Sequence, residues 1–134
     1  MPGYTLDTDI VIALLKGDIR LLTRIQTAQA SGASVSIGAL PYCEILRGFE
    51  KLGNPVKLAA FQAHCQSFGV LLVDSLSILV RAARIWADLS VKGMLLEDAD
   101  ILIAATALEK GCVLVTDDSD FQRVPGLGLE NWLV

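Results

Sequence analysis

Acidic side chains follow two short apolar segments of this 134-residue sequence. The segment Tyr4–Leu6 runs directly into the residues DTD, and the segment Val113–Val115 runs directly into TDDSD. The acids at these two places are Asp7, Asp9, Asp117, Asp118 and Asp120. If both segments are parallel strands of one sheet, their carboxyl ends lie at the same rim, which is where ligands bind in such sheets. The sequence therefore predicts one shared acidic site.

A further acid, Asp100, lies in a segment with helical spacing. Asp100, Ile103, Ala104 and Ala107 occupy the i, i+3, i+4 and i+7 positions that form one face of a helix. A carboxylate on an apolar face is costly unless it is paired, hydrogen-bonded or bound to a metal ion. We therefore expect Asp100 to belong to the acidic site.

Glu44, in LPYCEILRGF, shares a helix face with Arg47 and Gly48. One interpretation is an i, i+3 ion pair with Arg47 on a solvated helix, which contributes only a few tenths of a kcal/mol. The other is a carboxylate directed at the rim of the sheet, with Gly48 allowing a ligand to approach closely. The sequence alone leaves both open.

The predicted site is formed by four acids, which are Asp7, Glu44, Asp100 and one of Asp117 or Asp118. Two carboxylates about 4 Å apart repel by roughly 4 kcal/mol at an effective dielectric constant near 20, so four together require protons or a cation. The chain has one histidine, His64, and no C-x-x-C pair, which leaves oxygen ligands and favours Mg²⁺ or Mn²⁺ over zinc or copper. Such a cation supports hydrolysis of phosphodiester bonds.

Short strands and helices alternate along the chain and would position these acids. Apolar segments predict strands at residues 4–6, 35–37, 70–73 and 113–115, with an edge strand in the tail GLGLENWLV. Helical spacing predicts helices at 10–15, 19–28, 40–52, 55–68, 75–91 and 98–110, with Asp74 or Ser75 as the cap of the fifth. The continuous apolar run at 70–73 is typical of a strand buried on both faces. We expect one α/β domain over residues 1–134, with a short, mostly parallel sheet between two helical layers.

The composition excludes a disordered chain and indicates an apolar surface that is covered. Hydrophobic residues make up 53% of the chain and charged residues 19%, and the mean hydropathy is +0.54. We expect some large apolar side chains to line a dimer interface or a groove for a partner helix; the candidates are Phe49, Leu52, Phe61, Phe68 and Trp86. The net charge of −4 disfavours binding of nucleic acid through an overall basic surface.

The cysteines and the N-terminus indicate the compartment. Cys43, Cys65 and Cys112 form no paired motif, which indicates a reducing environment, and each has the apolar neighbours of a buried cysteine. The residues MPGYTLDTD lack the features of a secretory signal, and no apolar stretch reaches the roughly 18–20 residues that span a bilayer. We therefore expect a cytoplasmic protein without a membrane segment. His64 is expected on a helix surface, because no serine-elbow motif accompanies it.

Two other classes of protein fit part of the acidic pattern. DTDIV matches the D-x-D-x-[TV] opening of haloacid-dehalogenase-like phosphatases, with Asp7 as nucleophile and Asp9 as acid or base. Those enzymes need a lysine before the last acidic pair, and Lys92, at the end of a surface helix, fits poorly. A response-regulator receiver could use Asp74 as phosphoacceptor, but nothing supplies the lysine required after its fifth strand.

Across nearly its whole length the chain resembles PIN-domain proteins, and specifically the VapC-type toxins of bacterial toxin–antitoxin pairs. The resemblance lies in YTLDTDIVIALLKGD, SVSIGALPYCEILRGFEK, DADILIAATALEKGCVLVTDDSDFQRVPGL and the closing ENW, in that order over residues 4–132. It implies a parallel-sheet endoribonuclease with a Mg²⁺ or Mn²⁺ site. It also implies an RNA substrate and a cognate antitoxin as inhibitor. From the apolar composition we add a homodimer to these expectations.

Carried over position by position, the resemblance implies that the metal-binding and catalytic acids are Asp7, Glu44, Asp100 and Asp118. It implies that Thr116 orients the site and that Arg47 contacts the substrate or the antitoxin. Two positions depart from the family pattern. Asp9 stands where the family often has Asn, and the last motif is one residue short, so Asp117 and Asp120 are alternatives to Asp118.

Three alternatives to a toxin ribonuclease stay open at the level of the sequence. They are a phosphatase that uses Asp7, a PIN-like domain in RNA processing and a non-catalytic binding module. Basic residues on the predicted helices are candidates for an RNA groove, namely Lys16, Arg20, Arg24, Arg47, Lys51, Arg81 and Arg84.

Overall fold

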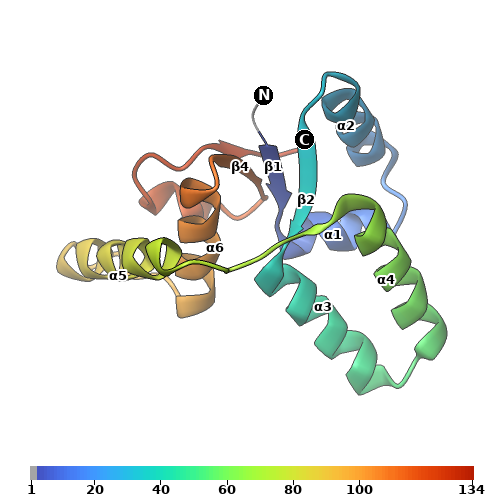
Figure 1. Ribbon diagram of the computed structural model, residues 1–134, viewed down its shortest axis with the longest axis horizontal. Helices are drawn as coiled ribbons and strands as arrows, with labels where there is room; N and C mark the ends of the chain where they lie inside the picture. The colour runs from blue at the N-terminus through green and yellow to red at the C-terminus, as the bar shows by residue number, and fades with distance from the viewer. Residues whose placement is uncertain (1–2) are drawn as a thin grey trace.

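The central sheet of the computed structural model, which describes residues 3–134, has five parallel strands in the order β3-β2-β1-β4-β5 (Figure 1). The strands are β1 (Gly3–Leu6), β2 (Ser34–Gly38), β3 (Val70–Leu71), β4 (Cys112–Val115) and β5 (Leu129–Glu130). Leu6 pairs with Ile37 of β2 on one side and with Val115 of β4 on the other. Asp7 therefore emerges from the middle of the sheet rim.

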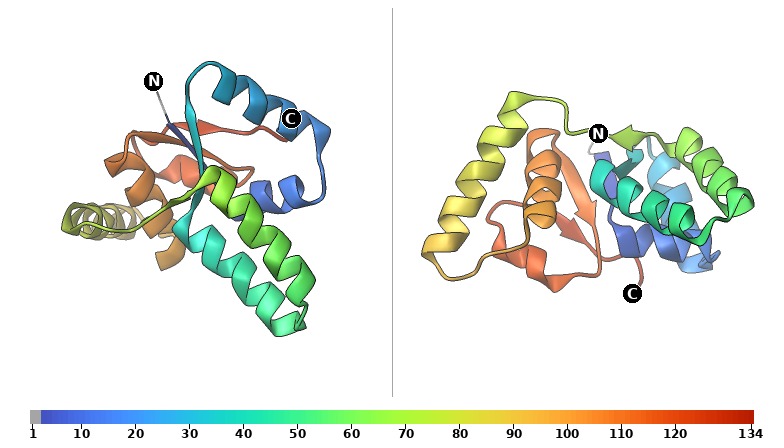
Figure 2. Two further views of the ribbon diagram at one scale, coloured as in Figure 1. Left: turned by 45° about the vertical axis from the view of Figure 1, so that its right-hand side comes forward. Right: turned by 90° about the horizontal axis from the view of Figure 1, so that it is seen from below.

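Helices cover both faces of this sheet. They are α1 (Thr8–Leu15), α2 (Ile19–Ala30), α3 (Ala39–Leu52), α4 (Pro55–Phe68), α5 (Leu76–Val91), α6 (Asp98–Glu109) and the 3₁₀ helix η1 (Ser119–Arg123). In Figures 1 and 2, α5 and α6 lie on one side of the sheet and α1 to α4 on the other. Successive residues of β4 point into different cores, Val115 toward α1–α4 and Leu114 toward α5 and α6. The predicted three-layer α/β fold is confirmed.

Local side chains set where two of the helices begin. Asn54 accepts a backbone N–H at the start of α4. The hydroxyl of Ser75 accepts the N–H of Ile78 at the start of α5, so Ser75 is the cap of that helix. Asp74 instead forms an ion pair with Lys110, with a nitrogen–oxygen distance of 2.9 Å. This pair ties the start of α5 to the end of α6.

The prediction for the third strand was wrong in length and burial. The strand ends at Leu71 rather than Val73, and both of its residues are only half-buried. It lies at the edge of the sheet and, within residues 3–134, pairs only with β2, so one of its sides has no neighbouring strand there. Leu72, 55% exposed, already belongs to the connection that crosses to α5. At the opposite edge, the tail forms β5 as expected.

Two of the three cysteines are also less buried than predicted. Cys65 is buried in the core, but Cys43 is exposed and Cys112 is intermediate. Cys43 is two residues from both Pro41 and Ile45, which form the buried face of α3, so it projects away from the core. His64 is exposed on α4, as predicted.

The large apolar side chains divide between core and surface. Phe61 is fully buried, and Phe49 and Phe68 pack partly buried against the core, whereas Leu52 and Trp86 are 75% and 48% exposed. Helix α5 buries one apolar face and exposes a second, consisting of Leu76, Leu79, Val80, Trp86 and Val91. Within residues 3–134, no helix combines the length and apolar character needed to cross a membrane.

Candidate active site

Asp7 is the central residue of the acidic site. It follows β1 directly, and its backbone N–H donates to the carbonyl of Val115 at 3.0 Å, which fixes it between β1 and β4. Its side chain is only 8% exposed. Burial is the main cause that raises the pKa of Asp7, hydrogen bonds from Thr116 and Thr8 oppose the shift, and the charges of Glu44 and Asp118 add to it.

Thr116 links the ends of β1 and β4. Its hydroxyl donates to Oδ2 of Asp7 at 2.8 Å and accepts the backbone N–H of Asp118 at 3.0 Å. The Thr116 side chain is buried, so these bonds form away from water, where they are strong. One hydroxyl thus sets the position of both Asp7 and Asp118.

The three acids after β4 lie in different environments. Asp118 is half-buried, caps η1 through the N–H of Asp120, and contributes to the raised pKa of Asp7. Asp117 is exposed and accepts a hydrogen bond from the carboxyl group of Asp9 when Asp9 is protonated. Asp120 is exposed and pairs with Arg123 at 3.4 Å. The structure therefore places Asp118 at the central cluster, Asp117 beside it and Asp120 away from it.

Glu44 reaches the rim from α3, which follows β2. Its Oε2 accepts the hydroxyl of Thr8 at 2.8 Å, although the two residues are 36 positions apart. Among the ion pairs of residues 3–134, none joins Glu44 to Arg47, so the geometry supports the rim interpretation over the solvated pair. Thr8 was missed in the sequence. Its position directly after Asp7, at the start of α1, was the available signal.

Asp100 lies in the first turn of α6 and faces the same cluster. The pKa of Asp100 is raised to about 6, first by burial and then by the charges of Asp7, Asp118, Glu97 and Glu44, in that order. The side chain is half-buried, as the apolar face of α6 predicted. We call the four carboxylates of Asp7, Glu44, Asp100 and Asp118 the acidic rim.

Asp9 and Asp117 form a second carboxyl pair beside the acidic rim. The pKa of Asp9 is raised to about 6, first because protonated Asp9 donates a hydrogen bond to Asp117, then by burial and by the charges of Asp117, Asp7 and Asp118. A protonated carboxyl can donate as an Asn amide does. Asp9 therefore provides a hydrogen-bond donor where the family often has Asn, but only while its carboxyl group is protonated.

The donors of the acidic rim fit a hydrated Mg²⁺ or Mn²⁺ ion. All are carboxylate oxygens, and the burial and mutual repulsion that raise the pKa of Asp7 and Asp100 would be relieved by a cation. Among residues 3–134, no group of three or more His, Cys, Asp or Glu side chains is placed to hold one metal ion together. This spread suits a cation that keeps several waters and takes one or two carboxylates directly.

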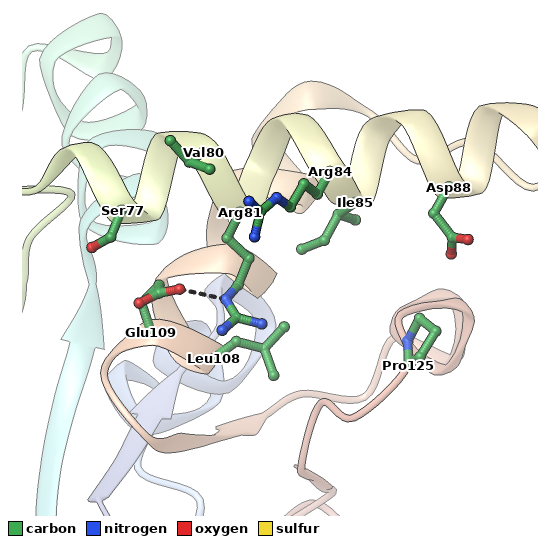
Figure 3. Close-up of a pocket in the computed structure, with 9 residues that line it drawn as sticks. All are labelled: Ser77, Val80, Arg81, Arg84, Ile85, Asp88, Leu108, Glu109 and Pro125. Carbon is green, nitrogen blue, oxygen red and sulfur yellow. Dashed lines mark hydrogen bonds and ion pairs between the residues drawn. The ribbon is translucent and has the colours of Figure 1, made fainter.

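A separate hollow of about 450 Å³, lined by residues of α5, the end of α6 and Pro125, contains none of the predicted acids (Figure 3). It lies beside α5, and the guanidinium of Arg81 there donates to Glu109 at 2.6 Å. Glu109 ends α6, about 13 Å along the helix from Asp100 at 1.5 Å per residue. Arg81 is thus engaged in a pair that joins α5 to α6.

Replacing Thr116 by Val is expected to weaken Mn²⁺ binding and any metal-dependent activity by about 10- to 100-fold, the usual range for a group that orients a metal ligand. The substitution keeps the shape but removes both hydrogen bonds of the hydroxyl, so Asp7 and Asp118 lose their common support. Isothermal titration with Mn²⁺ measures the effect. Thr106→Val is the matched control, because this buried hydroxyl donates only to Leu102 within α6. Equal losses in both variants would contradict a role for Thr116 in positioning.

Comparison with known proteins places the chain in a family. The PIN domain family matches residues 4–127. The chain is 31% identical to the ribonuclease VapC2 of Haemophilus influenzae over 134 residues, covering 99% of this chain and all of the relative. It is 32% identical to the ribonuclease VapC1 of Rickettsia felis, covering 93% and 92% of the two chains.

A solved structure gives the same result. The fold is similar to a chain in the crystal structure of DNA-bound VapBC from Salmonella typhimurium, with a TM-score of 0.88, 27% identity, and coverage of 98% of this chain and 99% of that one. The family match also spans every acid of the acidic rim. On the match over residues 4–127 and the relatives that align along the whole chain, this protein belongs to the PIN-domain family.

Proposed function

We propose that the protein is a divalent-metal-dependent endoribonuclease and the toxin of a toxin–antitoxin pair. The observation that carries the proposal is that four carboxylates lie near one another at one rim of the sheet in a PIN-domain chain, close enough for their charges to raise the pKa values of Asp7 and Asp100. RNA is the proposed substrate class because the relatives are named ribonucleases. We prefer this function to the phosphatase alternative for DTDIV, because the PIN-domain match includes these residues.

The proposed roles follow from burial and hydrogen bonding. Asp7 and Asp100 would bind a Mg²⁺ or Mn²⁺ ion directly, since their pKa values are raised by burial and by neighbouring charges. Glu44 and Asp118 would bind through its waters, because their oxygens accept bonds from Thr8 and from the Asp120 N–H. When bound, the cation supplies charge that stabilises a phosphoryl group under attack by water. Thr116 and Thr8 hold the acids in place.

We also propose a domain organisation, a compartment and two protein partners. We place the activity in one domain over residues 1–134, working in the cytoplasm. A cognate antitoxin is proposed as the inhibitor, since a similar chain was solved within a VapBC assembly. A homodimer is proposed from the exposed apolar face of α5.

The test is co-purification with the product of the neighbouring gene, separation, and cleavage of total RNA by the free chain. Cleavage is expected with Mg²⁺, but not with chelator and not after the partner is added back. RNA cleavage without any inhibitory neighbour would favour a role in RNA processing. Tight Mn²⁺ binding with no RNA cleavage would favour a non-catalytic module. Release of phosphate from small phosphomonoesters, with RNA left intact, would favour a phosphatase.

Replacing Trp86 by Ser is expected to shift the protein toward monomer. Trp86 is the largest side chain of the exposed apolar face of α5, and aromatic side chains contribute strongly to protein interfaces. Sedimentation velocity over a range of concentrations measures the change. Ile19→Ser is the matched control, because Ile19 is 77% exposed but lies on α2. A wild-type protein that stays monomeric at high micromolar concentration would disprove self-association.

A further inference from the structure

A groove of about 690 Å³ lies between α1, α3 and α4 and begins at the acidic rim. Thr8 and Glu44 line the end nearest the rim, and the groove continues along α3 to Leu52. From Glu44 to Leu52 the helix rises about 12 Å, at 1.5 Å per residue. A molecule bound at the rim can therefore extend directly into this groove.

The groove carries an excess of positive charge in an acidic protein. Lys16, Arg47 and Lys57 line it, and Glu44 is the one acid among its lining residues. None of these three cations takes part in an ion pair within the part of the chain that the structure describes. The net charge of the chain is −4, so this concentration of unpaired cations beside four carboxylates indicates an anionic ligand.

The walls of the groove between these cations are apolar. Ile12 on α1 is 38% exposed, Phe49 on α3 is half-buried, and Leu52 is 75% exposed. The ring of Phe49 is held by Phe61, with ring centroids 5.8 Å apart. A groove lined by both apolar side chains and cations suits a ligand that has flat apolar groups on an anionic backbone. Single-stranded nucleic acid has this chemistry.

Gly48 opens the floor of the groove. It lies inside α3 and is exposed, and a Cβ atom built on it would meet no atom within 4 Å. Glycine inside a helix is less stable than alanine, so neither the helix nor crowding requires it here. Because Gly48 has no side chain, a flat group of a ligand can approach the α3 backbone closely at this point.

We propose that this groove is the binding subsite for one unpaired nucleotide of the RNA, the one next to the phosphate held at the acidic rim. Its base lies over Gly48 against the apolar walls, and its phosphates face Lys16, Arg47 and Lys57. The inference rests on the proposed ribonuclease function and adds to it the part of the protein that selects the base. RNA is favoured over a partner peptide because Glu44 belongs to both the rim and the groove, so an RNA strand at the rim enters the groove without a break.

The experiment fills the groove while leaving the acids unchanged. Wild type, Gly48→Leu and Gly48→Ala are incubated in Mg²⁺ with a short single-stranded RNA that has a randomised centre, and the fragments are sequenced. Gly48→Leu is expected to lose the base preference at one position beside the cut. Its cleavage of the preferred sequence should fall about 5- to 150-fold, the value of one stacked base. Gly48→Ala adds only one methyl group, so it should weaken the preference less than Gly48→Leu does, and both variants should melt no lower than wild type.

Other results would contradict either the inference alone or the proposed function together with it. A wild type that cleaves no RNA would overturn the proposed function and this inference together. A wild type that cleaves with a base preference, alongside a Gly48→Leu variant that keeps both rate and preference, would overturn the inference alone. The same holds if Gly48→Leu leaves cleavage unchanged but prevents binding of the co-purified partner, since the groove would then be a protein-docking site.

Discussion

Replacing Asp100 by Asn is expected to reduce RNA cleavage by about 10³-fold or more, since a metal ion supplies several kcal/mol of stabilisation and about 1.4 kcal/mol corresponds to tenfold. Asp7→Asn should have the same effect. Both substitutions keep the shape of the side chain and remove the charge that would hold the cation. Single-turnover cleavage in Mg²⁺ measures the loss. Activity within a few-fold of wild type would remove that residue from the site.

The same variants are expected to leave the metal-free fold intact. The pKa of Asp100 is about 6 in the folded protein, above the ordinary value of 3.8. Its contribution to stability is therefore fully present below the ordinary pKa and is lost as the pH rises through about 6. At neutral pH, Asp100→Asn removes a half-buried charge that other acids repel, so its melting temperature without metal should equal or exceed that of wild type. The difference should shrink toward pH 4.

Asp98→Asn is the matched control for this prediction. Asp98 lies in the same first turn of α6, but its side chain is exposed to solvent. It should keep cleavage near the wild-type level. Loss of activity in Asp98→Asn as large as in Asp100→Asn would mean that charge at the start of α6, rather than a ligand at the acidic rim, accounts for the effect.

Removal of divalent metal is expected to abolish cleavage completely, and metal affinity should rise with pH. The raised pKa values of Asp7, Asp9 and Asp100 mean that the free cluster retains protons in mildly acidic solution. Because metal binding requires those protons to leave, affinity should increase between about pH 5 and 7, with proton release. Calorimetry in two buffers of different ionisation enthalpy measures the release. Cleavage should follow the same curve and increase further as metal-bound water ionises.

The choice of ion provides the control. Mn²⁺ should support cleavage at least as well as Mg²⁺, whereas Ca²⁺, with looser coordination, should bind and fail to activate. Full activity in excess chelator would contradict the metal mechanism. Metal affinity that does not change with pH would mean that the acids do not share one site.

Much of the fold could be predicted from local pattern. The helices at 40–52 and 55–68 match α3 and α4 closely, because apolar spacing, Asn54 and Pro55 act within a few residues of one another. Parallel pairing followed from short strands separated by helices. The errors at the 70–73 strand and at Cys43 concern burial. An apolar residue does not by itself reveal whether another strand or helix will cover it.

The sequence by itself determined which acids lie at strand ends and on which face of its helix Asp100 lies, since both follow from chain order and helical period. Only the tertiary structure distinguished the surroundings of Asp117, Asp118 and Asp120, and joined Thr8 to Glu44 across 36 residues. It also revealed the groove between α1, α3 and α4. The physical reason is that hydrogen bonds, raised pKa values and cavities arise between elements brought together by packing, whereas periodicity and capping act along one segment.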